Sequence, residues 1–216
     1  MNSKIFINLL LIILFCFSCS KKEIKKSVIN EKSLDLQVYE AYLEGKEFLE
    51  SGDVLYAAKK FNEAEILFPQ SEWAPKAALM AAYSYYIQNY YGDAISELIR
   101  FNRVYPRHIN LDYANYLLAI CYYEQIVDET KDLESIQNAK DTFILIINNF
   151  PNSEYAEDAK FKMELIYDIL ASKEMYLGRY YFNKQKWIPA INRFKTVVDE
   201  YDTTIYVEEA LHRLVE

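Results

Sequence analysis

The chain repeats one pattern of residues four times. In each copy an alanine is followed four residues later by Phe or Leu and, seven residues further, by Phe or Tyr. In three copies the next residue is Pro. These spacings place the side chains on one face of a helix, and Pro cannot continue a helix. Each copy therefore predicts a helix of about fourteen residues with one apolar stripe. The copies begin at Ala57, Ala94, Ala139 and Ala190.

The composition favours helices over turn-rich folds. The 216-residue chain contains 20 Tyr and 12 Phe but only 4 Gly and 5 Pro. A β-sandwich or barrel needs many tight turns, and a nucleotide-binding α/β domain needs a Gly-rich phosphate loop, so both are disfavoured. The net charge of −8 argues against a nucleic-acid partner, which would call for clustered Lys and Arg. An all-helical chain with short connections remains.

A helix with one apolar stripe needs a partner helix to cover that stripe. Upstream of the first copy, residues 34–51 predict another helix, and a turn follows at 51–53, so the two form an antiparallel pair. The small, aromatic and proline positions of this pair resemble the tetratricopeptide repeat, and two further pairs share the offsets. The matching residues are Gly45, Phe48, Gly52, Ala57, Phe61, Ala64 and Pro69, then Ala82, Tyr85, Ala94, Leu98 and Pro106, and then Gly178, Tyr181, Ala190 and Phe194.

This resemblance implies an all-α fold, a tetratricopeptide-repeat superhelical solenoid of antiparallel helix pairs over residues 34–216, with about four repeats and a truncated fifth. The intervals between the alanines exceed the roughly 34-residue period of that repeat. We place the excess in the loop 105–110, in the polar stretch 128–135 and in one unusually long helix within 153–183. The last helix is expected to begin near Ile205. Either this copy is truncated at Glu216 or a partner covers its last apolar face.

The N-terminal segment has the layout of a signal peptide. Lys4 precedes an apolar run, residues 5–17, which is shorter than the ~20 residues that a membrane-spanning helix needs. Residues 16–19 resemble a bacterial lipobox, in which Cys19 would be lipidated and become the mature N-terminus. The resemblance implies a signal peptide at 1–18 and a lipidated tether at 19–33, and Ser20 implies transfer to the outer membrane. A plain cleaved signal peptide and an uncleaved hydrophobic anchor are the alternatives.

Few residues of the chain suit catalysis. Besides its carboxylates it offers only two histidines, and His108, in the predicted loop 105–110, is interpreted as capping or spacing the following helix. It has no Cys/His pair at zinc spacing and no Gly-rich phosphate loop. Cys121 lies in an apolar helical run, which predicts a buried small hydrophobe. We therefore expect neither an enzyme nor a bound metal or cofactor.

Tyrosines are more abundant than one buried stripe per helix can accommodate. Tyr83, Tyr86 and Tyr90 share one helix face, because they are spaced by three and four residues. Tyr combines contact area with a polar tip and loses little side-chain entropy when fixed, so it suits a surface that binds extended polypeptide. Together with Tyr116, these three are candidates for a substrate groove. The alternative is ordinary packing of large side chains within the repeats.

Four stretches resemble the BamD family of outer-membrane assembly lipoproteins, in the family's order: 105–116, 150–156, 170–181 and 187–194. The resemblance implies a lipid anchor in the outer membrane on its periplasmic face. It also implies binding to a BamA-like insertase and other assembly lipoproteins, and delivery of unfolded outer-membrane proteins. In the family the N-terminal repeats form a groove for extended substrate, and the C-terminal repeats meet BamA. Asn192-Arg193 matches the family's partner-facing helix, which makes Arg193 a candidate for an interface ion pair.

Two other interpretations compete with this one. Arg193 could instead be an ordinary solvent-exposed residue, whose ion pair contributes under about 1 kcal/mol. The chain as a whole could be another outer-membrane repeat lipoprotein, an interaction scaffold in envelope division or pilus assembly. An enzyme of unknown type is the remaining alternative. The sequence does not identify the substrate or the accessory partners.

Overall fold

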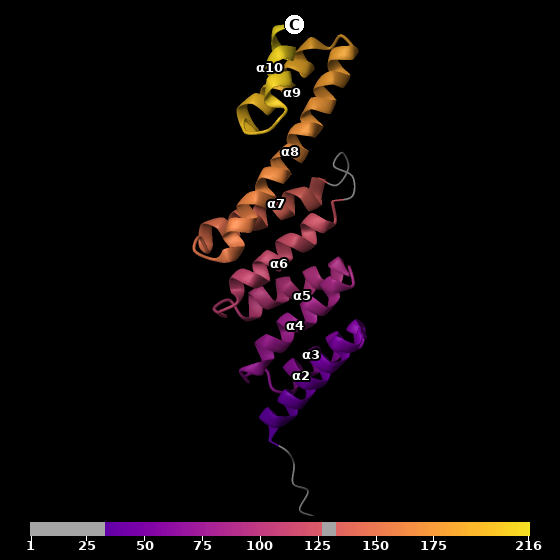
Figure 1. Cartoon of the computed structure of the whole chain (residues 1–216), viewed down its shortest axis with the longest axis vertical. Helices are drawn as coiled ribbons and strands as arrows, with labels where there is room; N and C mark the ends of the chain where they lie inside the picture. The colour runs from indigo at the N-terminus through magenta and orange to yellow at the C-terminus, as the bar shows by residue number, and fades with distance from the viewer. Residues whose placement is uncertain (1–32, 127–132) are drawn as a thin grey trace, which may run out of the picture. The chain divides into compact units, whose positions relative to one another are not determined.

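The computed structural model describes residues 33–126 and 133–216, and within these ranges every regular element is a helix (Figure 1). The all-α helical-repeat prediction is confirmed. The helices are α2 (Leu34–Ser51), α3 (Val54–Leu67), α4 (Trp73–Ile87), α5 (Tyr91–Val104), α6 (Leu111–Glu124), α7 (Leu133–Asn149), α8 (Glu154–Asn183), α9 (Trp187–Glu200) and α10 (Val207–Val215).

The helices of residues 33–216 pack in chain order, as the repeat pattern predicts (Figure 1). We call α2, α4, α6, α8 and α10 the A helices, and α3, α5, α7 and α9 the B helices. Each B helix packs against the A helix before it and the A helix after it. The first four A helices also contact one another in succession, from α2 through α8. A helices therefore lie side by side along one surface of this unit.

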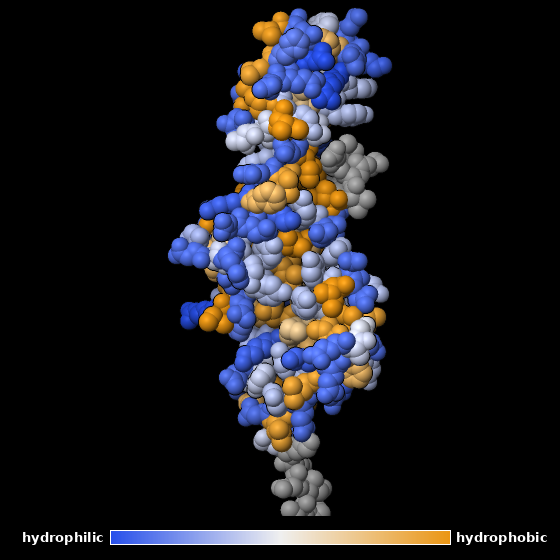
Figure 2. All heavy atoms as spheres, viewed as in Figure 1, coloured by the Kyte–Doolittle hydropathy of each residue, from blue (hydrophilic) through white to orange (hydrophobic). Residues whose placement is uncertain are grey.

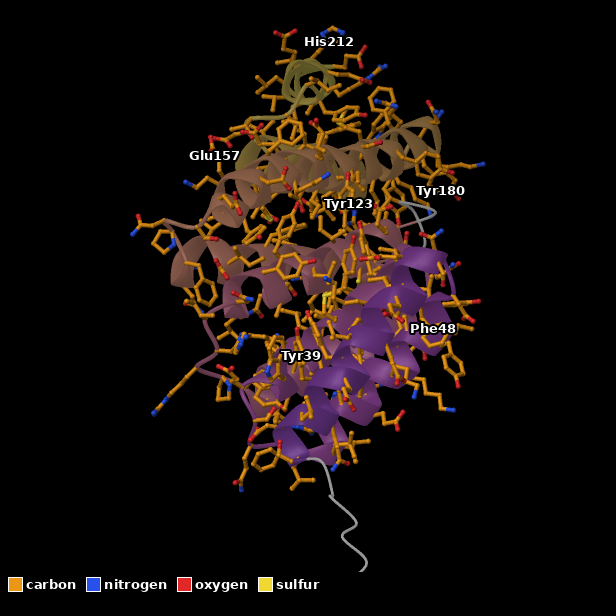
Figure 3. All side chains as sticks on the ribbon, turned by 60° about the horizontal axis from the view of Figure 1, so that its bottom comes forward. Tyr39, Phe48, Tyr123, Glu157, Tyr180 and His212 are labelled. Carbon is orange, nitrogen blue, oxygen red and sulfur yellow. The ribbon has the colours of Figure 1, made fainter. Side chains whose placement is uncertain are left out.

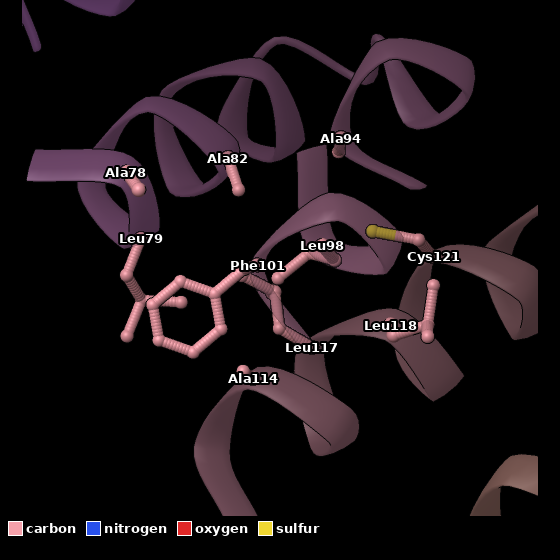
Figure 4. Packing of buried hydrophobic residues seen from close by; sticks show 10 residues of the cluster. All are labelled: Ala78, Leu79, Ala82, Ala94, Leu98, Phe101, Ala114, Leu117, Leu118 and Cys121. Carbon is pink, nitrogen blue, oxygen red and sulfur yellow. The ribbon is translucent and has the colours of Figure 1, made fainter. Parts of the chain in front are cut away.

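The repeated alanines and the apolar residues four positions later form the core. All eight are at most 1% exposed: Ala57, Phe61, Ala94, Leu98, Ala139, Phe143, Ala190 and Phe194. In the second repeat they join residues of α4 and α6 in one cluster around Phe101 (Figure 4). Cys121 belongs to the same cluster with no exposed surface, and burial raises the pKa of its thiol to about 12. The prediction that Cys121 is a buried small hydrophobe is confirmed.

Two glycines let an A helix approach a B helix closely. A Cβ atom added at Gly45 would lie 2.8 Å from the ring of Phe61, and one added at Gly178 would lie 2.5 Å from the ring of Phe194. Both distances are below van der Waals contact, and both rings are buried. The glycines at the small positions of the repeat are therefore there for packing. The packing that they permit offsets the ~1 kcal/mol by which Gly inside a helix is less favourable than Ala.

The first two B helices are joined by a buried ion pair. Glu65 of α3 is 7% exposed and accepts hydrogen bonds from Arg100 of α5, at 2.7 Å from Nη1 and 2.6 Å from Nη2. The hydroxyl of Tyr105 donates a third bond to the same carboxylate, at 2.8 Å. The Glu65 charge is thus paired and hydrogen-bonded, which is the condition under which a carboxylate tolerates burial. This network fixes α3 against α5.

Three predictions about helix lengths and helix boundaries can be compared with the structure. The long helix is confirmed, because α8 runs without a break for 30 residues. Of the polar stretch 128–135, the last three residues belong to α7, which begins at Leu133, and residues 127–132 lie outside the described chain. The last helix begins at Val207, two residues after the expected start near Ile205. The preceding residues form turns instead, in which the Thr204 and Val207 amides donate to the carbonyls of Tyr201 and Thr204.

The close approach at the glycines predicts a measurable cost of added bulk. Gly45→Ala and Gly178→Ala should each lower the free energy of unfolding by ~1–3 kcal/mol, since the buried Phe61 and Phe194 rings cannot move aside. Gly92→Ala is the matched control, because nothing lies within 4 Å of its added Cβ. Denaturant unfolding of the three variants checks this. Equal stability of all three would show that the small position is not required for packing.

Candidate functional site

A groove opens on the A-helix surface of the first three repeats. Its volume is about 490 Å³, and residues of α2, α4 and the start of α6 line it. Four of them come from α4 with spacings of three, four and seven residues, so they share one face of that helix. The lining residues are Tyr42, Lys76, Leu79, Met80, Tyr83, Asn110 and Tyr113. We call this the A-helix groove.

An aromatic cluster stands at one edge of the A-helix groove. The Trp73 ring centroid lies 5.1 Å from that of Tyr42 and 4.8 Å from that of Tyr39, which is labelled on α2 in Figure 3. Lys76 Nζ lies 4.4 Å from the Trp73 centroid, within cation–π range. The groove therefore has an apolar interior with a positive charge held at its edge.

The hydroxyls of Tyr42 and Tyr113 in the A-helix groove remain protonated at neutral pH. Burial raises the pKa of Tyr113 to about 12, with smaller contributions from neighbouring tyrosines, and it also raises the pKa of Tyr42. A protonated phenol both donates and accepts hydrogen bonds. These side chains can therefore bond to the N–H or the C=O groups of a polypeptide backbone.

His108 orders the loop before α6. Its ring packs edge-on against Phe101 with the centroids 5.5 Å apart, and its Nδ1 accepts a hydrogen bond from the Asn110 amide at 3.2 Å. Burial, and then the charge of Lys76, lowers the pKa of His108 below its ordinary value. At neutral pH the ring is therefore uncharged and its Nδ1 can accept. The spacing role predicted for His108 takes the form of this contact, which places Asn110 at the groove.

The four tyrosines predicted for a substrate groove lie in four different environments. Tyr83 lines the A-helix groove. Tyr86 packs against the two central core clusters, with its ring 6.3 Å from Tyr83 and 6.2 Å from Tyr91. Tyr90 is 45% exposed at the turn before α5. Of the four, Tyr83 alone is in the lining of this groove.

Tyr116 makes a contact between two A helices instead. Its hydroxyl donates to Asp158 Oδ2 of α8 at 2.6 Å, and its ring stacks on Tyr155 with the centroids 5.0 Å apart. Burial, and then this hydrogen bond, raises the pKa of Tyr116. Both the face and the polar tip of this residue are thus engaged within the protein.

The sequence prediction missed Tyr42, Tyr113 and Lys76. A signal for the first was present, because Tyr42 precedes the small residue Gly45 by three positions, as Leu79 precedes Ala82. Tyr42 and Leu79, which occupy the same position of their repeats, both line the groove. No such signal marks Lys76, because a lysine on a helix is usually solvated.

Arg193 lies on α9 and is already paired within the chain. Its Nη1 lies 2.9 Å from Oε2 of Glu174 on α8, and the two side chains are 41% and 15% exposed. The residue borders a depression of about 250 Å³, which is also lined by Tyr181, Ile188, Pro189, Asn192 and Thr196. Ile188 is 75% exposed there. A half-exposed guanidinium therefore adjoins an exposed apolar side chain.

The described residues offer few other functional features. None of their helices is both long and apolar enough to cross a membrane. In the same parts of the chain, no three His, Cys, Asp or Glu side chains are grouped so that they could hold a metal ion. Hydrophobic side chains do reach the surface in patches between charged ones (Figure 2). Cys19, the predicted lipidation site, lies outside the described residues.

Known proteins are similar to this sequence over most of its length. The sequence model of the YfiO family, described as "Outer membrane lipoprotein", matches residues 34–216. The outer membrane protein assembly factor BamD of Caulobacter vibrioides is 38% identical over 199 residues, which are 92% of this chain and 64% of that protein. BamD of Rickettsia prowazekii is 41% identical over 175 residues, covering 81% of this chain and 70% of the relative.

BamD of Neisseria gonorrhoeae is 33% identical over 189 residues, covering 82% of this chain and 70% of the relative. The chain thus spans between 64% and 70% of the length of these three relatives. The family match covers all helices of the described residues. The chain therefore belongs to the YfiO family of outer membrane lipoproteins, to which its BamD relatives also point.

Proposed function

We propose that the protein is a non-enzymatic component of the machinery that assembles β-barrel proteins in the outer membrane. The observation that carries this proposal is the family match across residues 34–216, together with three relatives named outer membrane protein assembly factor. The same relatives disfavour a scaffold for envelope division or pilus assembly. In the proposed role the chain binds a BamA-like insertase and other assembly lipoproteins, and it presents unfolded outer-membrane proteins to them.

The A-helix groove supports the step of substrate binding. Leu79 and Met80 offer apolar surface, and Tyr42, Tyr83 and Tyr113 add contact area with hydroxyls that pair with backbone groups. Lys76 and Asn110 supply a positive charge and an amide. This combination suits an extended segment with apolar or aromatic side chains and little dependence on exact sequence. Unfolded outer-membrane proteins are rich in such segments, because their strands alternate apolar and polar residues.

Substrate binding is tested together with the function by depletion and rescue. Depletion should remove β-barrel proteins from the outer membrane, and the original sequence should restore them. Met80→Glu should fail to restore them, because it replaces apolar contact surface of the groove with a solvated charged group, at a cost of ~1–3 kcal/mol in binding. Tyr90→Ala, outside the groove, should restore them.

Quantitative proteomics of isolated outer membranes measures these outcomes. Septation or filament defects with normal β-barrel levels would instead favour the alternative scaffold. Full rescue by Met80→Glu, at normal protein abundance, would separate the A-helix groove from the function.

Cys19 supports a lipid anchor, because the segment before it resembles a lipobox. Two or three acyl chains hold a protein firmly to a bilayer, whereas a single chain binds reversibly. Cys19→Ala should therefore move the protein from the membrane fraction to the soluble periplasmic fraction. Continued membrane retention after a carbonate wash, measured by immunoblotting, would contradict the anchor. Ser20→Ala is the control, and it should leave the protein in the membrane.

Arg193 supports an interface with the BamA-like insertase near the α8–α9 pair. Glu174 takes both of its hydrogen bonds from Nη1. A guanidinium has five N–H donors, so a partner carboxylate can bind Arg193 without displacing Glu174. The exposed Ile188 beside it would be covered in the same contact, since an apolar side chain next to a charged pair is typical of an interface core and rim.

Charge reversal tests this interface. Arg193→Glu should reduce copurification of the insertase by about tenfold or more, because it repels both Glu174 and a partner carboxylate. Arg193→Met retains the apolar stem and should give a smaller loss. Arg103→Glu, an exposed position on α5, is the control. Unchanged copurification with Arg193→Glu would remove this residue from the interface.

A further inference from the structure

Helix α8 serves as the A helix of two successive repeats. Its 30 residues compare with 15 in α4 and 14 in α6. Its first half buries Ala159 and Met163 in the cluster shared with α7, and its second half buries Ala171 and Met175 in the cluster shared with α9. Figure 1 shows α7 beside one half and α9 beside the other. The first half of α8 thus has no B helix directly after it.

A groove of about 320 Å³ lies where that B helix would pack. Its walls come from α7, from the first half of α8 and from one residue that follows α9. The lining residues are Ile144, Ile147, Asn148, Lys160, Met163, Glu164, Tyr167 and Thr203. We call this the α7–α8 groove. It is separate from the A-helix groove and shares no lining residue with it.

The α7–α8 groove continues the face of α8 that α9 covers. Glu164 precedes Ala171 by seven residues and Met175 by eleven, spacings that return to the same side of a helix. Ala171 and Met175 are buried in the cluster that contains α9 residues, whereas Glu164 is exposed. The part of this α8 face that α9 covers ends at Tyr201, which follows α9 and whose ring centroid is 6.0 Å from that of Tyr167. An element placed in the groove would therefore lie in line with α9.

The first repeat shows what normally adjoins this position, because its equivalent residues line a groove together with residues of the next B helix, α5. Asn62, Glu65 and Ile66 stand five, eight and nine residues after Ala57, and Ile144, Ile147 and Asn148 stand at the same offsets after Ala139. Glu65 bonds to Arg100 of the next B helix. At the equivalent position α7 carries Ile147, which is half-buried and lines the open groove. The first repeat, which bonds to its next B helix, thus has the charged Glu65 at this position. The third repeat, which has no B helix directly after α8 begins, has the apolar Ile147 there.

We propose that the α7–α8 groove binds an amphipathic helix of a partner protein, which takes the place of the absent B helix. Its apolar residues, at spacings of three or four, pack on Ile144, Ile147, Met163 and Tyr167. Lys160 and Glu164 at the rim select a partner helix with an acidic and a basic residue one turn apart, because these two side chains are themselves one turn apart. The A-helix groove takes extended polypeptide, whereas this groove takes a preformed helix.

The test is site-specific photo-crosslinking of the full-length chain in its native cells. A photoreactive phenylalanine replaces Asn148, which is exposed and lines the groove. Mass spectrometry identifies the adduct, and a reciprocal scan places the photoreactive residue along the partner segment. We expect crosslinks that recur every three or four positions of that segment, as on one helix face. Crosslinks that recur every second position would indicate an extended strand and would overturn the proposal.

Ile144→Glu and Ile99→Glu form a matched pair, because both isoleucines stand five residues after a repeated alanine and only Ile144 lines the groove. Ile144→Glu should reduce the adduct by about tenfold, and Ile99→Glu should leave it unchanged. Circular dichroism checks folding. If Ile144→Glu unfolds the chain, Glu164→Lys, at an exposed position, must instead reduce the amount of crosslinked adduct.

Absence of an adduct at Asn148, an adduct with lipid or with a second copy of this chain, or an adduct insensitive to both groove variants would each overturn the proposal. These outcomes are independent of whether depletion removes β-barrel proteins, because the depletion test and its variant concern the A-helix groove. A failure here therefore leaves the proposed function standing.

Discussion

The contact between a small residue on an A helix and an aromatic ring on the following B helix sets the geometry of the repeats. Gly45 meets Phe61, and Gly178 meets Phe194, at distances that leave no room for a methyl group. Since the rings are buried, the separation of the two helices is fixed by backbone against ring. Successive pairs then stack at the spacing that this contact imposes. The surface of adjacent A helices, and the groove in it, follow from that spacing.

Helix α8 shows how one element can change the array without breaking this contact. Its second half keeps the small position at Gly178 and packs on α9 in the ordinary way. Its first half packs on α7 as the next A helix should. What is lost is a turn and a B helix between the two halves. Because α8 is continuous, it keeps its contacts with both α7 and α9. One side of α7 is left without the B helix that would normally lie beside it.

Much of the fold could be predicted because its determinants are local. The prolines that end B helices, the small residues and the apolar spacing are all visible in short stretches, and the uninterrupted stretch before Gly178 predicted α8. The candidate site depends on contacts between distant residues. Tyr113 and Tyr116 are three residues apart, yet one lines the A-helix groove and the other bonds to Asp158, 42 residues away. No local pattern distinguishes these two tyrosines, and none marks Lys76 as a groove residue.

The buried carboxylate of Glu65 has a consequence for the energetics of binding. It holds α3 against α5 through Arg100 and Tyr105, and α3 and α5 pack against α2, α4 and α6, whose residues line the A-helix groove. A groove whose walls are braced in this way is ordered before any polypeptide arrives. An unfolded segment loses much conformational entropy when it is held, and a flexible receptor would add its own loss. In the proposed complex the entropic cost would fall mainly on the incoming chain, because an ordered groove has little freedom of its own to lose.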